Sequence, residues 1–411
     1  MKLKISVILA AATLALTYPQ TSFSQLLNKL KNTAKNTAEG RADEGAANAT
    51  NKAIDKGADA ATGNDNDNNS NNSSSSNSNN TTPSSSQPPG IKSYQNYDFV
   101  PGDKILFEDH FTDDQDGEFP SHWELLSGQG VLNKMNNTEV FALTDGNYVR
   151  VVPRLKTADY LTDPFTVEYD TYFTEGSYGL MVFFKKSGSE SNDDGHVYIN
   201  ESEITYDGGD DDFHLGASLP SAIAEDNYKN KWHHIALAYK NKQLKVYVDQ
   251  FRVLTIPDMH MVPANVHFGG IGSQDAPMIF KDVRIASGGN MNMIGKKFTE
   301  SKIVTHGINF DVDKATIKPE SMGTLNMIVG VMKDNPDIKF EIDGHTDNSG
   351  EAAHNLTLSQ QRADAVKTQL VSMGIDASRL TTKGFGDTKP ISDNSTLEGK
   401  ANNRRVEFVK M

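Results

Sequence analysis

The sequence contains no cysteine among its 411 residues. This absence excludes a disulfide framework, a thiolate metal site and a cysteine nucleophile. We also expect no lipid-modified cysteine behind a signal peptide. The fold must therefore be held together by ordinary hydrophobic cores, and a chain of this length is long enough to bury two of them.

Long apolar runs are also missing. The chain begins with MKLK, continues with the apolar residues 5–17 and then has a polar stretch that ends at Ser24. This order is typical of a secretory signal peptide, so we expect residues 1–24 to be removed and the protein to be exported. The apolar run is about 13 residues long, whereas a membrane-spanning helix needs ~20, and no later run is long enough. The sequence therefore predicts no transmembrane helix.

Positive charge is scarce, and the formal net charge is −14. Residues 98–290 hold 31 acidic and 15 basic side chains, a net charge of −16, whereas residues 301–411 hold 15 and 14, a net charge of −1. Phosphate binding depends on a basic surface. The composition therefore argues against nucleic acid as a partner.

Two segments after the signal peptide have little apolar surface. Residues 25–61 place leucines and alanines four apart, which fits either a docking helix for a partner or lipid surface, or a solvated, partly helical spacer. Residues 62–92 are rich in Asn and Ser with almost no apolar side chains. Because such a segment cannot bury enough surface to offset its ordering entropy, we expect a disordered linker.

Residues 95–288 alternate apolar and polar side chains in short runs, which is typical of β-strands. The clearest runs are FTVEYDTYF (165–173), GLMVFFKK (179–186), HHIALAYK (233–240) and QLKVYVD (243–249). Only Asn241 and Lys242 separate the last two runs, so these should form a hairpin. Many strands without a long helical pattern predict an all-β, two-sheet sandwich.

Two stretches of this region resemble known jelly-roll domains. KWHHIALAYKNKQLKVYVDQFRVLTIP (231–257) resembles the signature hairpin of laminin-G-like and concanavalin-like jelly rolls, although Gln250 stands where the strand turn usually has glycine. FEDHFTDDQDGEFPSHW (107–123) resembles the opening strand of such domains in bacterial envelope proteins. The resemblance implies a jelly-roll fold and leaves open a glycan-binding module, an adhesive surface or an enzyme.

One strand of this region resembles part of a glycosidase site. Glu168 and Asp170 are two apart, like the start of the paired-carboxylate site of jelly-roll glycosidases, which needs a nucleophile and an acid. Phe173 stands where the third acidic residue of that motif would be. We therefore expect a structural strand, no catalytic residue and no enzyme.

The acidic stretches 113–118 and 207–212 are candidates for calcium binding. Neither has the spacing of a complete calcium loop, so solvated acidic loops are the alternative. We expect no other cofactor and no other metal.

From residue 298 to residue 411 the pattern changes to strands that alternate with helices. Pro319 opens one helical pattern, and Asn335-Pro336 should end it. Thr357 and Gln360 fit a capping box, and Gly374 should end the second helix after a buried stripe of Ala363, Val366, Leu370 and Met373. With strands expected at 302–310, 338–344, 379–386 and 404–411, the order β-α-β-α-β-β predicts a small α+β sandwich.

In this layout Asp347 lies just beyond a strand and Arg362 lies in the early turns of the next helix, with Asn355 on the loop between them. An arginine binds a carboxylate with two parallel hydrogen bonds, and an aspartate suits an ammonium group. A shallow pocket that contains both would fit a zwitterion. The alternative is that Asp347 and Arg362 form an ion pair with each other, which at a surface is worth only ~0–1 kcal/mol.

Five motifs occur in order in this region. They are INFDVDKATIKPES (308–321), GHTDNSG (344–350), NLTLSQQRADAV (355–366), GIDASRLTTKGFGDTKPI (374–391) and NNRRVEF (402–408). Together they resemble the OmpA-like C-terminal domain. The resemblance implies non-covalent binding of peptidoglycan through the diaminopimelate residue of its stem peptide.

The same resemblance assigns roles to residues. Asp347 would take the ammonium group of diaminopimelate and Arg362 its carboxylate, while Asn355 would add a neutral hydrogen bond and Arg404 would close the pocket. Asp313 falls where relatives often carry Asn or Asp near the ligand, although it could instead cap the turn at Lys314.

His345 precedes this site, but no second histidine or acid is found at ligand spacing in the sequence, so we interpret it as structural. The sequence thus predicts an exported Gram-negative envelope protein, periplasmic or associated with the outer membrane, that binds peptidoglycan and so anchors the jelly roll to the cell wall. The jelly roll could contact a polysaccharide or an envelope protein. The alternative function is a polysaccharide-binding or polysaccharide-cleaving jelly roll attached to murein.

Overall fold

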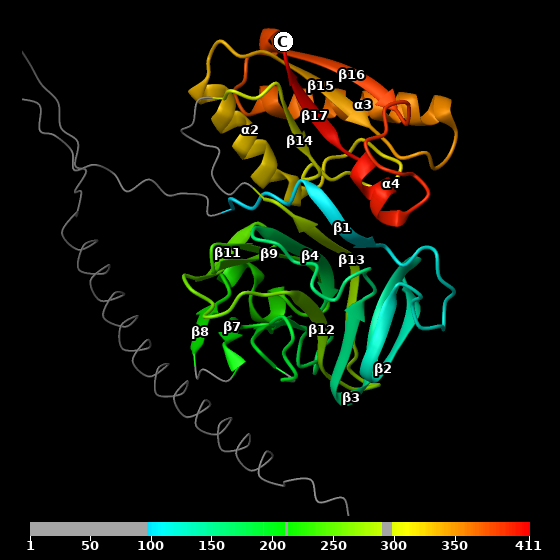
Figure 1. Ribbon diagram of the computed structural model, residues 1–411, viewed down its shortest axis with the longest axis vertical. Coiled ribbons are helices and arrows are strands. Elements are labelled where there is room, and N and C mark those ends of the chain that lie inside the picture. Colours follow the sequence, from blue (N-terminus) through cyan, green and yellow to red (C-terminus); the bar gives the residue numbers. More distant parts are fainter. Residues whose placement is uncertain (1–96, 192, 210–212, 290–297) are drawn as a thin grey trace, which may run out of the picture. The chain divides into compact units, whose positions relative to one another are not determined.

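The computed structural model describes residues 97–191, 193–209, 213–289 and 298–411 (Figure 1). Every described residue belongs to one compact unit, Gly90–Met411. The expected signal peptide, Ala-rich segment and linker lie outside the described residues. Within the described ranges, every helix is too short or too polar to span a membrane.

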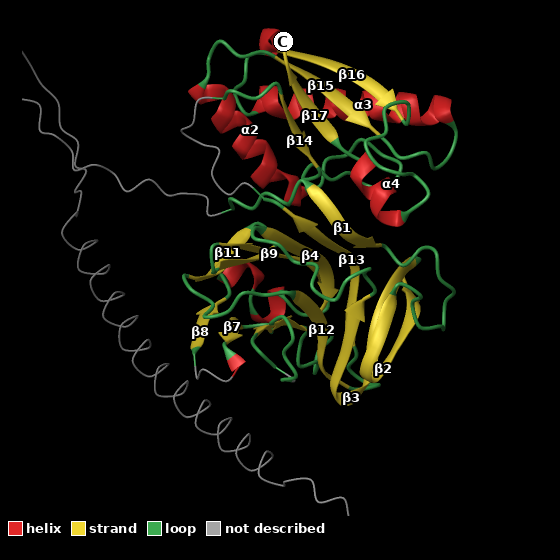
Figure 2. Cartoon of the chain, in the orientation of Figure 1, coloured by secondary structure: helices red, strands yellow, loops and turns green. Residues whose placement is uncertain are grey.

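Residues 97–289, here called the β region, form an antiparallel sheet of 13 strands (Figure 2). Hydrogen bonds connect the strands in the order β11-β10-β9-β4-β13-β3-β12-β5-β6-β7-β8, with β1 on β13 and β2 on β3. The strands are β1 (Lys104–Asp109), β2 (Trp123–Met135), β3 (Thr138–Pro153), β4 (Phe165–Tyr172), β5 (Met181–Lys185), β6 (His196–Ile199), β7 (Glu203–Asp207), β8 (His214–Ser218), β9 (Trp232–Lys240), β10 (Gln243–Val248), β11 (Phe251–Ile256), β12 (Asn265–Gly272) and β13 (Met278–Ser287). Two single-turn helices, η2 (Ser221–Ile223) and η3 (Glu225–Asn227), precede β9.

One hydrophobic core draws on strands along the whole path of this sheet. Trp123 is fully buried and packs against Phe268 and Phe280, while Tyr206 of β7 and Val246 of β10 belong to the same cluster. Residues from both ends of the path thus share a core, so the continuous sheet must curve around it. The expected strand-rich region is confirmed, and the jelly-roll topology stays a prediction.

The hairpin between β9 and β10 forms where the sequence placed it. Asn241 and Lys242 both have positive φ, 49° and 66°, as a two-residue turn that follows the strand twist requires. The stretch 107–123, in contrast, is not one strand. β1 ends at Asp109 and β2 begins at Trp123, because the acidic, Gly- and Pro-containing residues between them form turns rather than ladder pairs.

Residues 298–411, here called the C-terminal region, have a four-stranded sheet in the order β14-β17-β15-β16, in which only β15 and β16 run parallel. The elements are β14 (Lys302–Thr305), η4 (Pro319–Ser321), α2 (Met322–Asp334), β15 (Phe340–His345), α3 (Ala352–Ser372), η5 (Ala377–Arg379), β16 (Leu380–Gly386), α4 (Leu397–Asn403) and β17 (Val406–Lys410). The expected order β-α-β-α-β-β is therefore correct, with the short α4 added before the last strand.

α2 and α3 pack on the same face of this sheet. Phe340 and Ile342 of β15 point to that face and share a fully buried core with Leu325 of α2 and Val366 of α3. Gly344 lets α3 approach, since a Cβ there would lie 2.2 Å from the Ser359 carbonyl oxygen. The side chains that follow β15 are thereby held next to the start of α3.

The expected start of α3 is wrong. The helix begins at Ala352, so Thr357 and Asn355 both lie inside it rather than at its cap or on the loop. Thr357 Oγ1 donates to the carbonyl of Ala353, four residues earlier, at 3.0 Å. Ala352 and Ala353 follow Glu351 and favour a helix, so α3 begins before the predicted capping box.

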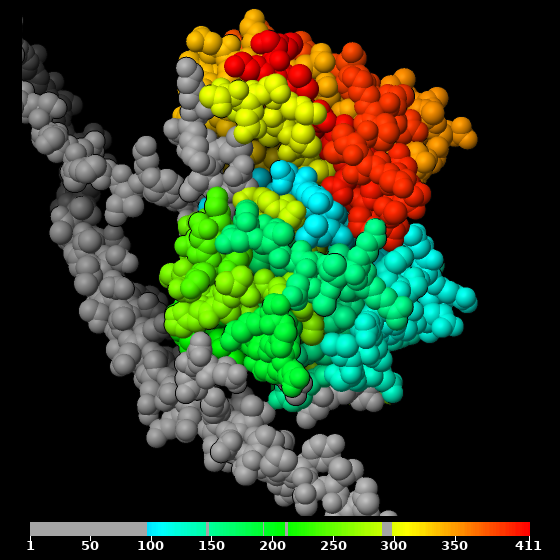
Figure 3. Space-filling view, in the orientation of Figure 1, coloured from blue at the N-terminus to red at the C-terminus, as the bar shows by residue number. Residues whose placement is uncertain are grey.

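The β region and the C-terminal region are joined by buried contacts. Ile105 of β1 donates its N–H to Asn402 Oδ1 and accepts from Asn402 Nδ2, both at 2.9 Å. In Figure 3 the atoms of β1 and of the residues around α4 lie against one another. Val100, which precedes β1, belongs to the core of the C-terminal region. The two regions therefore share one hydrophobic and polar interface.

Candidate functional site

The loop after β15 is held by its own side chains. Ser349 donates its backbone N–H to Asp347 Oδ1 at 2.8 Å, which forms an Asx turn. The buried Asn355 donates Nδ2 to the carbonyls of Asp347 and Ser349 at 3.3 and 3.0 Å. Asn355 thus fastens the loop to the first turns of α3, a positioning role that its place on a helix makes possible.

Asp347 is buried and is paired with Arg404. Its Oδ2 accepts from Arg404 Nη1 at 2.5 Å. Burial alone would raise the pKa of Asp347, but the Ser349 N–H and Arg404 outweigh it and hold the pKa below its ordinary value. Asp347 is therefore a carboxylate at neutral pH, and its two oxygens have lone pairs left for a further donor.

Arg404 also reaches into the β region. Its Nη2 donates to Oε2 of Glu108, a β1 residue whose side chain is only 2% exposed. Glu108 Oε1 in turn accepts from Arg284 Nε at 2.7 Å. Burial would raise the pKa of Glu108, but the two arginines and His110 hold it well below its ordinary value. A buried carboxylate of the β region therefore fixes Arg404 beside Asp347.

Arg362 lies on the third turn of α3 and turns toward the loop before η4. Nε donates to the Lys314 carbonyl at 2.9 Å and Nη2 to the Asp311 carbonyl at 3.4 Å, and the guanidinium lies 4.9 Å from the ring centroid of Phe310. Burial lowers the pKa of Arg362. Within the described residues no carboxylate pairs with it, so its charge is balanced only at a distance, and three of its five N–H donors are free for a ligand.

Asp313 lies on the same loop with a φ of 55°, and its Oδ1 meets His354 Nε2 at 2.5 Å. Both side chains are more than half exposed. The capping role considered for Asp313 is not what it does, because its partner is the α3 histidine. His354 was missed by the sequence reasoning.

The structure therefore gathers the five predicted residues around the start of α3, with Asp347, Arg404 and Asp313 each close enough to Arg362 to change its pKa. The alternative of an ion pair between Asp347 and Arg362 is wrong, because Arg404 takes the place of Arg362. Two residues were missed by the sequence reasoning: Glu108 and Arg284 lie in the β region, and Glu108 is 296 positions away from Arg404. Only the fold brings them there.

A small cavity of about 140 Å³ opens beside Arg404. It is lined by Glu108, Asp109, His110, Thr112 and Asp113 from the β region, and by Ser349, Leu397, Lys400 and Arg404 from the C-terminal region. Arg362 is not part of its lining. Asp347 does not line it either, so this cavity is distinct from the predicted pocket around Asp347 and Arg362.

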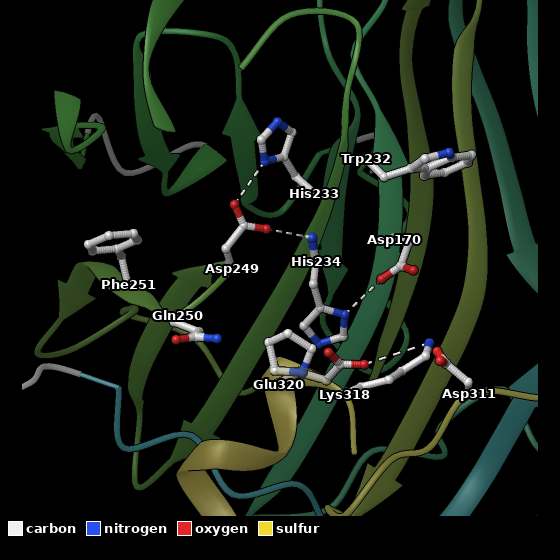
Figure 4. Close-up of a pocket in the computed structure, with 11 residues that line it drawn as sticks. Asp170, Trp232, His233, His234, Asp249, Gln250, Phe251, Asp311, Lys318 and Glu320 are labelled. Carbon is white, nitrogen blue, oxygen red and sulfur yellow. Dashed lines mark hydrogen bonds and ion pairs between the residues drawn. The ribbon is translucent and has the colours of Figure 1, made fainter. Parts of the chain in front are cut away.

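A larger cleft of about 550 Å³ lies elsewhere on the interface (Figure 4). From the β region it is lined by Asp170, Trp232, His233, His234, Asp249, Gln250 and Phe251, and from the C-terminal region by Asp311, Lys318, Pro319 and Glu320. Asp249 accepts from His233 Nδ1 and from the backbone of His234, while His234 Nδ1 meets Asp170 at 2.8 Å. Aromatic and polar side chains thus surround one hollow.

The glycosidase-like acids are engaged in structure. Glu168 is 3% exposed and lies 3.5 Å from His234 Nε2 and 3.9 Å from Arg284, and Phe173 is buried. Asp170 binds both His234 and Lys281. Both carboxylates are therefore ion-paired, and a buried phenylalanine occupies the third acidic position of the glycosidase motif.

His345 has acidic neighbours that the spacing argument missed. Asp343 is two residues earlier on the same strand face, and Glu407 of β17 pairs directly with Asp343, so ligand atoms of the three lie within 4.8 Å of one another. Lys302 and Arg405 already bind Glu407, at 2.8 and 2.7 Å. The protein's own cations thus neutralise the carboxylate that would be the third ligand.

The structure describes the first of the two acidic stretches completely and the second only in part. Among the described residues the cluster at His345 is the only place where three such ligand side chains gather, so residues 113–118 do not form one. Residues 210–212 of the second stretch lie outside the described residues. Calcium binding stays a prediction.

The comparisons with known proteins bear on the C-terminal region. The sequence model of the OmpA family matches residues 309–404. These residues, which contain all five predicted site positions, are an OmpA-family domain. The β region lies outside the match.

Individual relatives match about a quarter of the chain. "Probable lipoprotein YiaD" of Escherichia coli (strain K12) is 46% identical over 104 residues, 25% of this chain and 48% of the relative. "Peptidoglycan-binding protein ArfA" of Mycobacterium tuberculosis (strain ATCC 25618 / H37Rv) is 42% identical over 107 residues, 26% of this chain and 33% of the relative. The chain thus spans less than half the length of these relatives.

Among solved structures, the peptidoglycan-associated lipoprotein from Burkholderia pseudomallei is 25% identical. The match covers 29% of this chain and 98% of that chain, with a TM-score of 0.25.

Proposed function

We propose that the protein binds peptidoglycan without a covalent bond, through the site at the start of α3, and so anchors the β region to the cell wall. The observation that carries the proposal is that a loop-held carboxylate, Asp347, lies close enough to Arg362 to affect its pKa, while Arg362 has no acidic partner among the described residues. The relative named as a peptidoglycan-binding protein supports the polymer class. The protein would therefore act in the cell envelope as a structural component.

The ligand we infer is the diaminopimelate residue of the stem peptide. Its free end carries an ammonium and a carboxylate group on one carbon. Arg362 would bind the carboxylate with its free N–H groups, and Asp347 would accept from the ammonium with lone pairs that Ser349 and Arg404 leave open. Asn355 would hold the loop, and Arg404 would balance the charge of Asp347.

Removal of either charge tests this site. Purified full-length protein is sedimented with isolated peptidoglycan, and the bound fraction is compared for the wild type, Arg362→Ala and Asp347→Asn. Both changes should reduce binding by about 2–5 kcal/mol, since each leaves a ligand charge without its partner. Lys333→Ala is the control, because it removes one positive charge from an exposed position of α2. Wild-type binding by both site variants would reject the proposed site.

The alternative of a polysaccharide-cleaving jelly roll has less support. Glu168 would have to act as nucleophile, yet it is buried and lies between Arg284 and His234. We therefore propose that the β region is not a glycosidase. Neither the wild type nor Glu168→Gln should then turn over any member of a panel of polysaccharides.

A further inference from the structure

The cleft between the two regions has a size and a lining suited to a small or extended ligand. Its volume of about 550 Å³ lies within the range of ~300–1,000 Å³ that is usual for ligand sites. Such sites combine apolar and aromatic walls with a few polar groups. Phe251, which is 37% exposed, and Pro319 supply apolar surface, and Trp232 is half-buried.

Hydrogen-bonding groups in the cleft remain available. Within the described residues, neither the exposed amide of Gln250 nor Nε1 of Trp232 makes a hydrogen bond. In Figure 4 the side chain of Gln250 lies on the side of the hollow nearest Phe251, whereas the carboxylate of Glu320 points toward Lys318, 3.7 Å from its Nζ. An amide, an indole N–H and carboxylates together offer both donors and acceptors, which is what the hydroxyl groups of a sugar require.

The charge of the cleft selects against anionic ligands. Four carboxylates line it: Asp170, Asp249, Asp311 and Glu320. Lys318 and His234 provide positive charge. His234 is protonated at neutral pH, because Asp170 and Glu168 outweigh the effect of burial and raise its pKa to about 10. The lining thus keeps an excess of negative charge within a β region that is itself strongly acidic. A polyanion would be repelled, whereas an uncharged chain would not.

We propose that this cleft binds a neutral glycan chain, with Phe251 as the apolar contact for a sugar ring and with Gln250, Trp232 and Glu320 as hydrogen-bonding partners for its hydroxyl or N-acetyl groups. The inference goes beyond the proposed stem-peptide site, because it concerns other residues and another part of the ligand. It does not require diaminopimelate recognition.

The position of the cleft relates it to the stem-peptide site. Asp311 and Lys318, which line the cleft, belong to the loop whose carbonyls at Asp311 and Lys314 hold Arg362. The ends of this loop are tied by the Lys318 N–H, which donates to the Asn309 carbonyl at 2.9 Å. One short segment therefore borders both sites, so the sugar strand of peptidoglycan is one source of a neutral glycan, and a separate polysaccharide is the other.

Calorimetric titration of the full-length protein tests the proposal. The probes are an N-acetylglucosamine tetramer and cellotetraose as the neutral glycans, and polygalacturonate as the anionic polymer. At least one neutral probe should bind, and Phe251→Ala and Gln250→Ala should each weaken that binding about tenfold, ~1.4 kcal/mol. Tyr178→Ala is the control, because it removes an exposed aromatic ring that does not line the cleft.

The pattern of binding identifies the glycan. Binding of the N-acetylglucosamine tetramer without cellotetraose assigns the cleft to an N-acetylated strand such as that of peptidoglycan. Binding of cellotetraose assigns it to a wider class of neutral polysaccharide. None of these probes contains a stem peptide, so the result is independent of the site at Asp347. The proposal is overturned if no neutral probe binds at millimolar concentration, if only polygalacturonate binds, or if both cleft variants bind like the wild type.

Discussion

At the interface of the two regions, replacement of Glu108 should lower the free energy of unfolding more than replacement of any other residue. Its carboxylate is 2% exposed and binds Arg284 and Arg404, so Glu108→Gln leaves two guanidinium groups with one buried negative charge fewer. Removal of one partner from a buried ion pair costs about 3–5 kcal/mol. At ~2 °C for each kcal/mol in a protein of this size, the midpoint of thermal unfolding should fall by about 6–10 °C.

Urea unfolding followed by tryptophan fluorescence measures this cost. Both tryptophans of the chain lie in the β region, and Trp123 donates to Asp109, the neighbour of Glu108. Glu118→Gln makes the same change at an exposed position and should alter stability by less than ~0.5 kcal/mol. The pKa of Glu108 is depressed in the folded protein. Its contribution to the free energy of unfolding is therefore complete above the ordinary pKa of ~4.3 and is lost as the pH falls toward the pKa in the folded protein. Equal stability of Glu108→Gln and Glu118→Gln at pH 7 would refute this reasoning.

Two further perturbations test the same interface. Asn402→Ala leaves the buried N–H and C=O of Ile105 without partners, at about 1–3 kcal/mol for each group, and chemical denaturation at neutral pH should show the loss. Asp170 and Glu168 raise the pKa of His234 to about 10 against the effect of burial. The protonated His234 should therefore stabilise the fold fully below pH ~6.5, and this stabilisation should disappear as the pH rises through about 10. The difference in unfolding free energy between the wild type and His234→Gln should therefore shrink toward pH 10, and a constant difference would contradict it.

Local signals in the sequence predicted four strands of the β region, β4, β5, β9 and β10, and the order of strands and helices in the C-terminal region. The hairpin at Asn241 and Lys242 and the end of α3 at Gly374, with a φ of 94°, follow from backbone preferences of single residues. The start of α3 did not follow, because the capping signal at Thr357 competes with helix-favouring residues before it. Local preferences decide an element only where they agree with one another.

The candidate site was predictable only in part. Asp347, Arg362 and Asn355 come from one strand, loop and helix, so their proximity follows from short-range topology. The partner of Arg404 is Glu108, almost 300 positions earlier, and no periodicity or spacing relates the two. For the same reason the cleft could not be predicted, since its lining comes from β4, β9, β11 and the turn before it, and from η4 and the loop before it.

The most direct test of the stem-peptide site compares two soluble muropeptides, one with diaminopimelate and one with lysine at the same position, which lacks the second carboxylate. The account predicts that the wild type binds the diaminopimelate form more tightly by about 2–5 kcal/mol, that Arg362→Ala abolishes this preference, and that Lys333→Ala keeps it. Equal affinity of the wild type for the two muropeptides, or an unchanged preference in Arg362→Ala, would contradict it.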